Sequence, residues 1–213
     1  MGSDLHEGLY GRLYAWLYDR VIRRAEAAGL RQMRADLLGE AEGRTVEIGA
    51  GTGLNLEHYP PAVTELMLVE PSRYMAAKLR RRVATGTRRA RVVECGGEAL
   101  PLADGAADTV VITLVLCTAP DPGAVLREVG RILRPGGRLL FLEHVRSPDA
   151  RIARWQDRLD RPWCVLGNGC HCNRDTRATI EASPLSLERI AATELPLAGP
   201  LARPAIIGLA RRD

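Results

Sequence analysis

The feature that most constrains this chain is a glycine-rich turn after a short apolar segment, Val46-Glu47-Ile48-Gly49-Ala50-Gly51-Thr52-Gly53-Leu54-Asn55. Glycine adopts positive φ at little cost and lets a ligand approach the backbone closely. The residues after the turn can begin a helix, whose free N–H groups then face whatever lies over the turn. The stretch therefore predicts a strand, a ligand cradle and a helix within an α/β fold.

The spacing of the glycines separates two classes of cofactor. A dinucleotide site follows G-x-G-x-x-G, and Leu54 occupies the position of its third glycine. The glycines fall instead at 49, 51 and 53, after Glu47. A buried carboxylate beside the turn repels a pyrophosphate but attracts an ammonium or sulfonium group. Because glycine motifs are permissive, a structural turn without a ligand is the remaining alternative.

The acid-x-G-x-G-x-G pattern resembles motif I of the class I S-adenosylmethionine (SAM) methyltransferases. This resemblance implies an α/β, Rossmann-like fold with a seven-stranded, mostly parallel sheet, an antiparallel closing strand, helices on both faces and an N-terminal helical lid. It also implies SAM as cofactor and S-adenosylhomocysteine as product. The cofactor contacts that it implies within the motif are Glu47, Gly49, Ala50, Gly51, Gly53 and Asn55.

The end of the second predicted strand carries a further cofactor signal. The apolar run that ends at Val69 is followed by Glu70-Pro71-Ser72. An acid about 20 residues after the glycines is placed to bind a ribose diol, because a carboxylate accepts hydrogen bonds from both hydroxyls. We expect Ser72 to cap the next helix. In that helix Met75 is either a core residue or a contact for the adenine face.

Residues 95–102 resemble the D-A-E-x-L-P segment that packs beside adenine in many small-molecule methyltransferases. The acid that would bind the adenine amino group is replaced here by Gly96. We therefore expect the backbone to recognise adenine, at Gly97, Glu98 and Ala99.

A continuous apolar run over 108–117 predicts a buried central strand. Ligands of open α/β sheets bind at the carboxyl ends of the strands, so Leu114, Val115 and Leu116 are expected beside the methyl donor. The L-R-P-G-G segment at 133–137 is a second resemblance to the methyltransferases.

A fifth strand is expected after that segment and ends near His144. Two late runs, 186–194 and 203–211, predict a closing antiparallel pair.

The N-terminal region, 4–38, shows helical spacing of apolar residues with a break at Gly29. Tyr10, Tyr14 and Tyr18 recur every four residues. They form either a packing face or, as in similar methyltransferases, a lid whose hydroxyls reach the cofactor or the substrate. We assign Tyr10 and Tyr14 to the cofactor site.

The chain of 213 residues is expected to form a single domain, 1–213. Within it we predict a helical lid over 1–40 and a substrate-cap insertion over 146–183. The net charge is +4, the arginines are scattered and there is one phenylalanine. These features argue against nucleic acid as a partner. We expect a small-molecule substrate and a monomer or homodimer.

The five cysteines form no even, regular framework, which favours a reduced, cytoplasmic location. The first residues lack a basic segment followed by an apolar one, so no signal peptide is expected. No apolar run reaches about 18 residues, so no transmembrane segment is expected.

A narrower resemblance is carried by LVLCTAPDP (114–122), FLEHV (141–145), GCHCNRDT (169–176) and RPAIIGLA (203–210). These segments are similar to the methyltransferase-like protein 7 family, which includes alkyl thiol S-methyltransferases in animals. The resemblance implies a thiol acceptor and, because the N-terminal membrane anchor of the animal members is absent, a soluble form. Two alternatives stay open. One is an O-, N- or C-methyltransferase of a natural product, quinone or lipid amine. The other is a SAM-binding protein without methyl transfer.

A thiol acceptor gains from a nearby base, because a thiol with a pKa of about 8.5 is mostly protonated at neutral pH. His144 is the first candidate since it ends a strand at the ligand edge, and His171 in the cap is the second. Either one is alternatively a structural histidine. Cys170 and Cys172 form a C-x-C pair without a second matched pair, so we expect no metal site.

Overall fold

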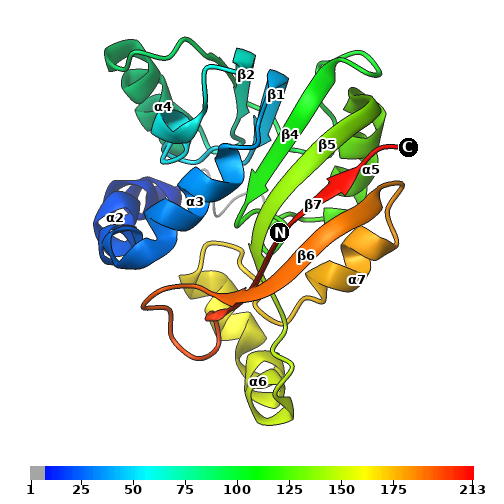
Figure 1. Cartoon of the computed structure of the whole chain (residues 1–213). Coiled ribbons are helices and arrows are strands. Elements are labelled where there is room, and N and C mark those ends of the chain that lie inside the picture. The colour runs from blue at the N-terminus through cyan, green and yellow to red at the C-terminus, as the bar shows by residue number, and fades with distance from the viewer. Residues whose placement is uncertain (1–7) are drawn as a thin grey trace.

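The computed structural model describes residues 8–213, and the start of the predicted 4–38 helical region lies outside them. Seven strands form one sheet in the order β3-β2-β1-β4-β5-β7-β6 (Figure 1). β1 to β5 run parallel, and β7 pairs antiparallel with both β5 and β6. The predicted mostly parallel sheet with an antiparallel closing strand is therefore confirmed. The strands are β1 (Gly43–Ile48), β2 (Val63–Val69), β3 (Arg91–Val93), β4 (Ala107–Thr113), β5 (Leu133–His144), β6 (Ser186–Glu194) and β7 (Pro204–Arg211).

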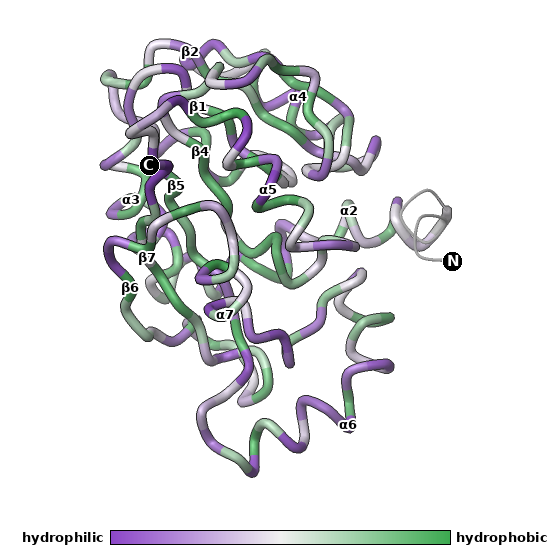
Figure 2. The backbone as a smooth tube through the Cα atoms, turned by 90° about the vertical axis from the view of Figure 1, so that its right-hand side faces the viewer, coloured by the Kyte–Doolittle hydropathy of each residue, from purple (hydrophilic) through white to green (hydrophobic). Residues whose placement is uncertain are grey.

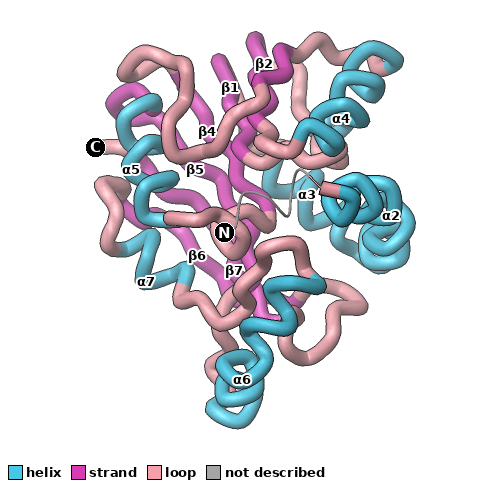
Figure 3. The backbone as a smooth tube through the Cα atoms, turned by 180° about the vertical axis from the view of Figure 1, so that it is seen from behind, coloured by secondary structure: helices cyan, strands magenta, loops and turns pink. Residues whose placement is uncertain are grey.

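Helices cover both faces of this sheet. Those in the described residues are α2 (Leu9–Ala25), the π-helical turn η1 (Glu26–Leu30), α3 (Arg31–Leu38), the 3-10 turn η2 (Leu56–His58), α4 (Arg73–Thr85), α5 (Pro122–Ile132), α6 (Ala150–Leu166) and α7 (Thr176–Glu181). Figure 3 shows α5 and α7 over one face, and α3 packs against β5 from the other. The predicted break at Gly29 is present, with a φ of 131° between α2 and α3. None of the helices in 8–213 is both long and apolar enough to cross a membrane.

Side-chain alternation explains why the central strands are apolar throughout. Val110 and Ile112 of β4 pack in the layer that contains α5, whereas Val111 packs in the layer that contains α3. Successive side chains of a strand point to opposite faces, so a strand covered on both sides needs apolar residues at every position. Figure 2 shows hydrophobic colour along the middle of β4 and β5.

The central strand is shorter than predicted, and the difference shapes the site. β4 ends at Thr113, and Leu114 has a φ of 60°. A left-handed backbone ends the extended conformation, so the apolar residues that follow form a loop although their composition favours a strand. The Glu143 carboxylate accepts hydrogen bonds from the N–H groups of Val115 (2.7 Å) and Leu116 (3.1 Å) and holds this loop at the carboxyl edge of the sheet.

Candidate functional site

The glycine turn has one packed side and one open side. Gly49, Gly51 and Gly53 all have positive φ, at 69°, 56° and 86°. A Cβ at Gly49 would overlap the side chain of Val115, and one at Gly53 would lie 2.6 Å from Leu79 Cδ1. A Cβ at Gly51 would meet nothing within 4 Å. The open side of the cradle therefore lies at Gly51, where a ligand can approach the backbone.

Glu70 lies beside this open side, as its position after β2 predicted. Its carboxylate accepts hydrogen bonds from the N–H of Gly51 (2.8 Å) and the N–H of Ser72 (2.9 Å). Burial raises the pKa of Glu70, and the two N–H groups oppose that rise. Ser72 caps α4 through its hydroxyl, which accepts a hydrogen bond from the N–H of Met75. Pro71, between Glu70 and Ser72, is exposed. The acid thus fixes the glycine turn relative to α4.

Glu47 braces the turn from inside the protein. Its oxygens accept from Asn55 Nδ2 (2.9 Å) and from the hydroxyl of Tyr59 (2.7 Å), and only 1% of the residue is exposed. Burial raises its pKa to about 7. Asn55 also donates to Thr113 Oγ1 at 2.9 Å and accepts from Arg34 Nη1 at 2.9 Å. Both side chains thus have partners within the protein, and their contact with the cofactor stays a prediction. Glu47 points into the layer of α3, opposite to its neighbours Val46 and Ile48.

The segment expected to read adenine lies over the end of β1. A Cβ at Gly97 would come within 2.6 Å of Ile48 Cγ2, so only glycine allows this approach. Glu98 is half-buried and Ala99 is exposed. Ala50 donates its N–H to the carbonyl of Val69 at 2.9 Å, which holds the glycine turn against β2. The three segments that were predicted separately therefore converge at one edge of the sheet.

The tyrosine stripe of α2 runs across this edge. Rings of Tyr10 and Tyr14 stack with centroids 6.3 Å apart, and those of Tyr14 and Tyr18 lie 5.8 Å apart. Burial raises the pKa of Tyr14, and the nearby side chains of Tyr18, Cys170 and Cys117 raise it further. Tyr14 therefore lies close enough to these cysteines to interact with them electrostatically.

The hydroxyl of Tyr10 has partners in α6, and its cofactor contact stays a prediction. Its hydroxyl donates to the carbonyls of Val165 (2.8 Å) and Leu166 (3.0 Å) rather than reaching toward the glycine turn. These carbonyls end α6 and have no partner within the helix. Tyr10 therefore joins α2 to the end of α6.

Two contacts that anchor α2 are not indicated by any local sequence pattern. Thr52, inside the glycine turn, donates its hydroxyl to Asp19 Oδ1 at 2.6 Å, and Lys78 of α4 pairs with Asp19 Oδ2 at 3.0 Å. Asp19 thus fixes α2 over the turn. An acid on a predicted surface helix gives no indication of such a role, because its partners are distant in sequence.

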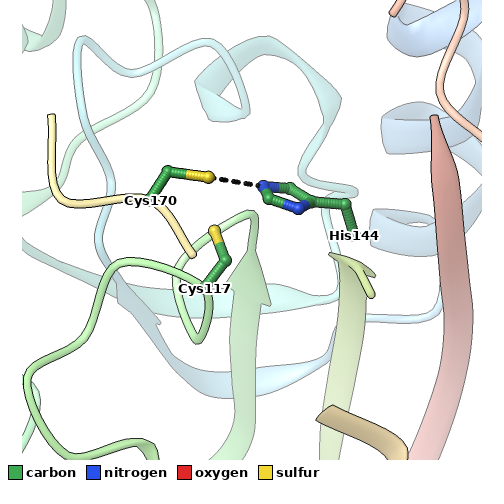
Figure 4. Close-up of side chains that lie close together, drawn as sticks. All are labelled: Cys117, His144 and Cys170. Atoms are coloured by element: carbon green, nitrogen blue, oxygen red, sulfur yellow. Dashed lines mark hydrogen bonds between the residues drawn. The ribbon is translucent and has the colours of Figure 1, made fainter. Parts of the chain in front are cut away.

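A buried cluster of sulfur and imidazole lies at the carboxyl edge of the sheet. Cys117 follows β4, His144 ends β5, and Cys170 belongs to the connection between α6 and α7 (Figure 4). Their sulfur and nitrogen atoms all lie within 4.8 Å of one another. His144 Nε2 is 3.3 Å from Cys170 Sγ, and Cys172 Sγ lies 3.7 Å from the same sulfur.

Neighbouring groups shift the pKa values of Cys170 and His144 in opposite directions. Hydrogen bonds from Cys117, Cys172 and His144 lower the pKa of the Cys170 thiol although burial opposes this. Burial alone would lower the pKa of His144, but Cys170 and Glu143 outweigh it and the net shift is upward. In the described part of the chain, His144 Nδ1 is buried without a hydrogen-bond partner.

His171 is not brought to this cluster. Its Nδ1 lies 2.8 Å from Asp160 Oδ1, and its Nε2 lies 3.5 Å from Cys164 Sγ. The sulfur atoms of Cys170 and Cys172 lie 3.7 Å apart, whereas the ring of His171 contacts Asp160 and Cys164 of α6. Its backbone N–H donates to the carbonyl of Cys117 at 2.8 Å. The backbone of His171 thus holds the connection between α6 and α7 on the loop after β4, and its catalytic role stays a prediction.

Comparisons with known proteins agree with this geometry. Residues 46–141 match the family model described as a methyltransferase domain. The chain is 38% identical over 156 residues to thiol S-methyltransferase TMT1B of Rattus norvegicus, which covers 71% of this chain and 64% of that protein. It is 36% identical over 169 residues to thiol S-methyltransferase TMT1A of Homo sapiens, which covers 78% and 69%. The chain thus spans slightly less than two thirds of the first relative and slightly more than two thirds of the second.

A solved structure shows the same fold. Geranyl diphosphate C-methyltransferase from Streptomyces coelicolor A3(2), in complex with Mg²⁺, geranyl diphosphate and S-adenosylhomocysteine, superimposes with a TM-score of 0.68. The match covers 85% of this chain and 79% of that chain at 16% identity.

Proposed function

This chain belongs to the thiol S-methyltransferase family of class I SAM-dependent methyltransferases, and from this membership we propose that it methylates the sulfur of a small-molecule thiol. The observation that carries the proposal is the position of the Cys117, His144 and Cys170 cluster at the same sheet edge as the glycine cradle. Val115 links the two, because it contacts Gly49 and lies two residues before Cys117.

The residues of the cradle fit SAM, which supplies an activated methyl group on a sulfonium. Gly51 offers an open backbone, and the Glu70 carboxylate beside it is an acceptor for ribose hydroxyls. We assign adenine to the backbone of 97–99 and the face of Met75. The loop of 114–116 lies beside the methyl group in this assignment. Glu47 supports the turn from beneath and contributes to binding through its geometry.

The acceptor end favours a thiolate. A free thiol is only a few per cent ionised at pH 7, and the thiolate is the nucleophile. We place the acceptor sulfur beside His144, whose side chain is buried at the end of β5. His144 promotes ionisation either as a proton acceptor or as the ligand of a metal ion. Burial of the site excludes water and strengthens the interactions that align donor and acceptor.

The lid (1–40) and the cap (146–183) complete a single domain (1–213) in this proposal. The hydroxyl of Tyr10 joins them, and the backbone of His171 holds the cap on the sheet. The acceptor is a small molecule rather than nucleic acid, and the protein acts as a monomer or homodimer. All five cysteines, each within the described residues, are free thiols. This supports a reduced, cytoplasmic location.

An acceptor panel tests the function. The purified protein is incubated with SAM and separate alkyl thiols, aryl thiols, amines and phenols, and products are identified by mass spectrometry. We expect an S-methyl product and S-adenosylhomocysteine in equal amounts. Turnover restricted to oxygen, nitrogen or carbon acceptors contradicts the assignment of the acceptor atom. Cofactor binding without product from any acceptor contradicts methyl transfer itself.

A further inference from the structure

Three side chains from separate parts of the chain meet at one point in the site. Cys117 comes from the loop after β4, His144 from the end of β5 and Cys170 from the cap, and all three point toward one another (Figure 4). We propose that they bind one zinc ion and leave its fourth coordination position for the acceptor sulfur. Metal binding stands on the geometry of these residues alone, whereas the role of the fourth position rests on the proposed function.

The distances suit a tetrahedral ion. Zinc lies about 2.3 Å from a thiolate sulfur and about 2.0 Å from an imidazole nitrogen, so ligand atoms of one centre lie roughly 3.5 to 3.8 Å apart. The distance from His144 Nε2 to Cys170 Sγ is 3.3 Å, and no pair among the three ligand atoms exceeds 4.8 Å. Shifts of less than about 1 Å bring all three onto one ion.

The chemistry and burial of the ligands select zinc. Thiolate and imidazole are soft or borderline ligands that suit zinc, whereas magnesium and calcium require oxygen ligands. Cys117 is 1% exposed, His144 7% and Cys170 8%. Two thiolates balance the charge of a divalent cation, and buried charges are paired or bind metals.

Neighbouring groups hold the ligands in place without the ion. The carbonyl of Cys117 accepts from the backbone of His171, and the Trp163 indole N–H donates to Cys170 Sγ at 3.4 Å. The carboxylate of Glu143 fixes the two residues that precede Cys117. Such outer contacts orient the ligands of metal sites.

Three protein ligands leave one position of a tetrahedral ion free, the arrangement of catalytic Cys₂His zinc sites. Cys172 Sγ touches Cys170 Sγ at 3.7 Å but is not one of the three mutually close ligand atoms. We infer that the acceptor thiol occupies this position. Its proton passes to the solvent, because a thiol that coordinates a metal is deprotonated outright.

The thiolate sulfur then uses its electron pair to form a bond to the methyl carbon while the bond from that carbon to the sulfonium breaks. The products are a thioether and neutral S-adenosylhomocysteine. The thioether is uncharged and a weaker ligand than a thiolate, so it leaves the ion. His144 serves as a ligand in this scheme and the metal replaces a general base.

Metal content of the whole chain tests the site. Protein purified without chelators, loaded with Zn²⁺ and dialysed is analysed by mass spectrometry for metals. We expect one tightly bound ion per chain, and its loss in the variants Cys117→Ser, His144→Ala and Cys170→Ser. Cys95→Ser, which changes a half-buried thiol elsewhere, is the matched control and keeps the ion. Folded wild-type protein that retains no zinc overturns the proposal.

Cobalt substitution tests the coordination geometry and the open position on the wild-type protein. It therefore applies even if the variants do not fold. Wild-type protein loaded with Co²⁺ is expected to show the strong visible absorption of a tetrahedral thiolate site. Addition of 2-mercaptoethanol without SAM is expected to shift this spectrum. If cobalt binds but its spectrum does not change on addition of the thiol, the ion has no open coordination position. Loss of zinc from the Cys172→Ser variant would likewise contradict the open position, because Cys172 would then be the fourth ligand. Zinc binding without methyl transfer to any thiol instead contradicts the proposed function and leaves the metal site intact.

Discussion

The variant Gly51→Ala separates cofactor binding from backbone strain. Gly51 has a φ of 56°, and an added Cβ points into open space. Placing a non-glycine residue in this left-handed conformation costs about 1–2 kcal/mol. For a chain of this size each kcal/mol lowers the unfolding temperature by about 2–4 °C, so we expect a decrease of about 2–8 °C. Because the new methyl group occupies the open side of the cradle, SAM affinity should fall at least about tenfold, or about 1.4 kcal/mol.

Gly105→Ala is the matched control. Gly105 has a φ of 67°, and its added Cβ would lie 3.7 Å from Arg134 Cα in ordinary contact. It lies in the turn just before β4, at the opposite end of the strand from the cradle. Calorimetry should show wild-type affinity for S-adenosylhomocysteine in this variant, with a similar loss of thermal stability. Equal affinity of the Gly51→Ala and Gly105→Ala proteins would refute the assignment of the open side as the cofactor cradle.

Three further predictions concern the buried and connecting groups. Burial raises the pKa of Glu47 from 4.5 to about 7, so the folded state binds this proton more tightly than the unfolded state. The free energy of unfolding therefore falls as the pH rises from 4.5 to about 7, by up to about 3 kcal/mol from this group. Glu47→Gln should flatten the profile measured by urea unfolding, and an unchanged slope contradicts the reasoning. Arg34→Met leaves Glu26, its partner at 3.0 Å, buried without a counter-charge. It should destabilise the protein by about 3–5 kcal/mol; the double variant Glu26→Leu/Arg34→Met should recover part of this, and no recovery rules out the pair as the cause. Tyr10→Phe removes the two hydrogen bonds to α6. It should speed amide hydrogen exchange at the end of α6 more than Tyr14→Phe does, and equal rates argue against the tie.

Local patterns in the sequence predicted most of the fold. The glycine spacing, the acid after β2 and the apolar period of the late strands are each encoded by neighbouring residues, and β6 was found at Ser186–Glu194 as expected. The predicted end of the central strand was wrong. The residues after Thr113 are still apolar, but the backbone leaves the extended conformation at Leu114. Backbone N–H groups of this turn donate hydrogen bonds to the distant carboxylate of Glu143, and no local pattern indicates them.

The site was predictable where its parts occur at a characteristic spacing along the sequence. The position of Glu70 beside the glycine turn followed from spacing alone. The inward direction of Glu47 did not, because it depends on Tyr59, twelve residues later. The meeting of Cys117 and His144 with Cys170 depends on how the cap folds back on the sheet, so a count of C-x-C spacing in one segment could not reveal it.

A structure of the protein crystallised with S-adenosylhomocysteine and a non-reactive thiol analogue tests the central claim most directly. We predict ribose hydroxyls on the Glu70 carboxylate, the ligand backbone over Gly51, and the ligand sulfur facing the cluster of Cys117, His144 and Cys170. A ligand bound elsewhere, or one whose sulfur points away from that cluster, would contradict the account of methyl transfer to a thiol at this edge of the sheet.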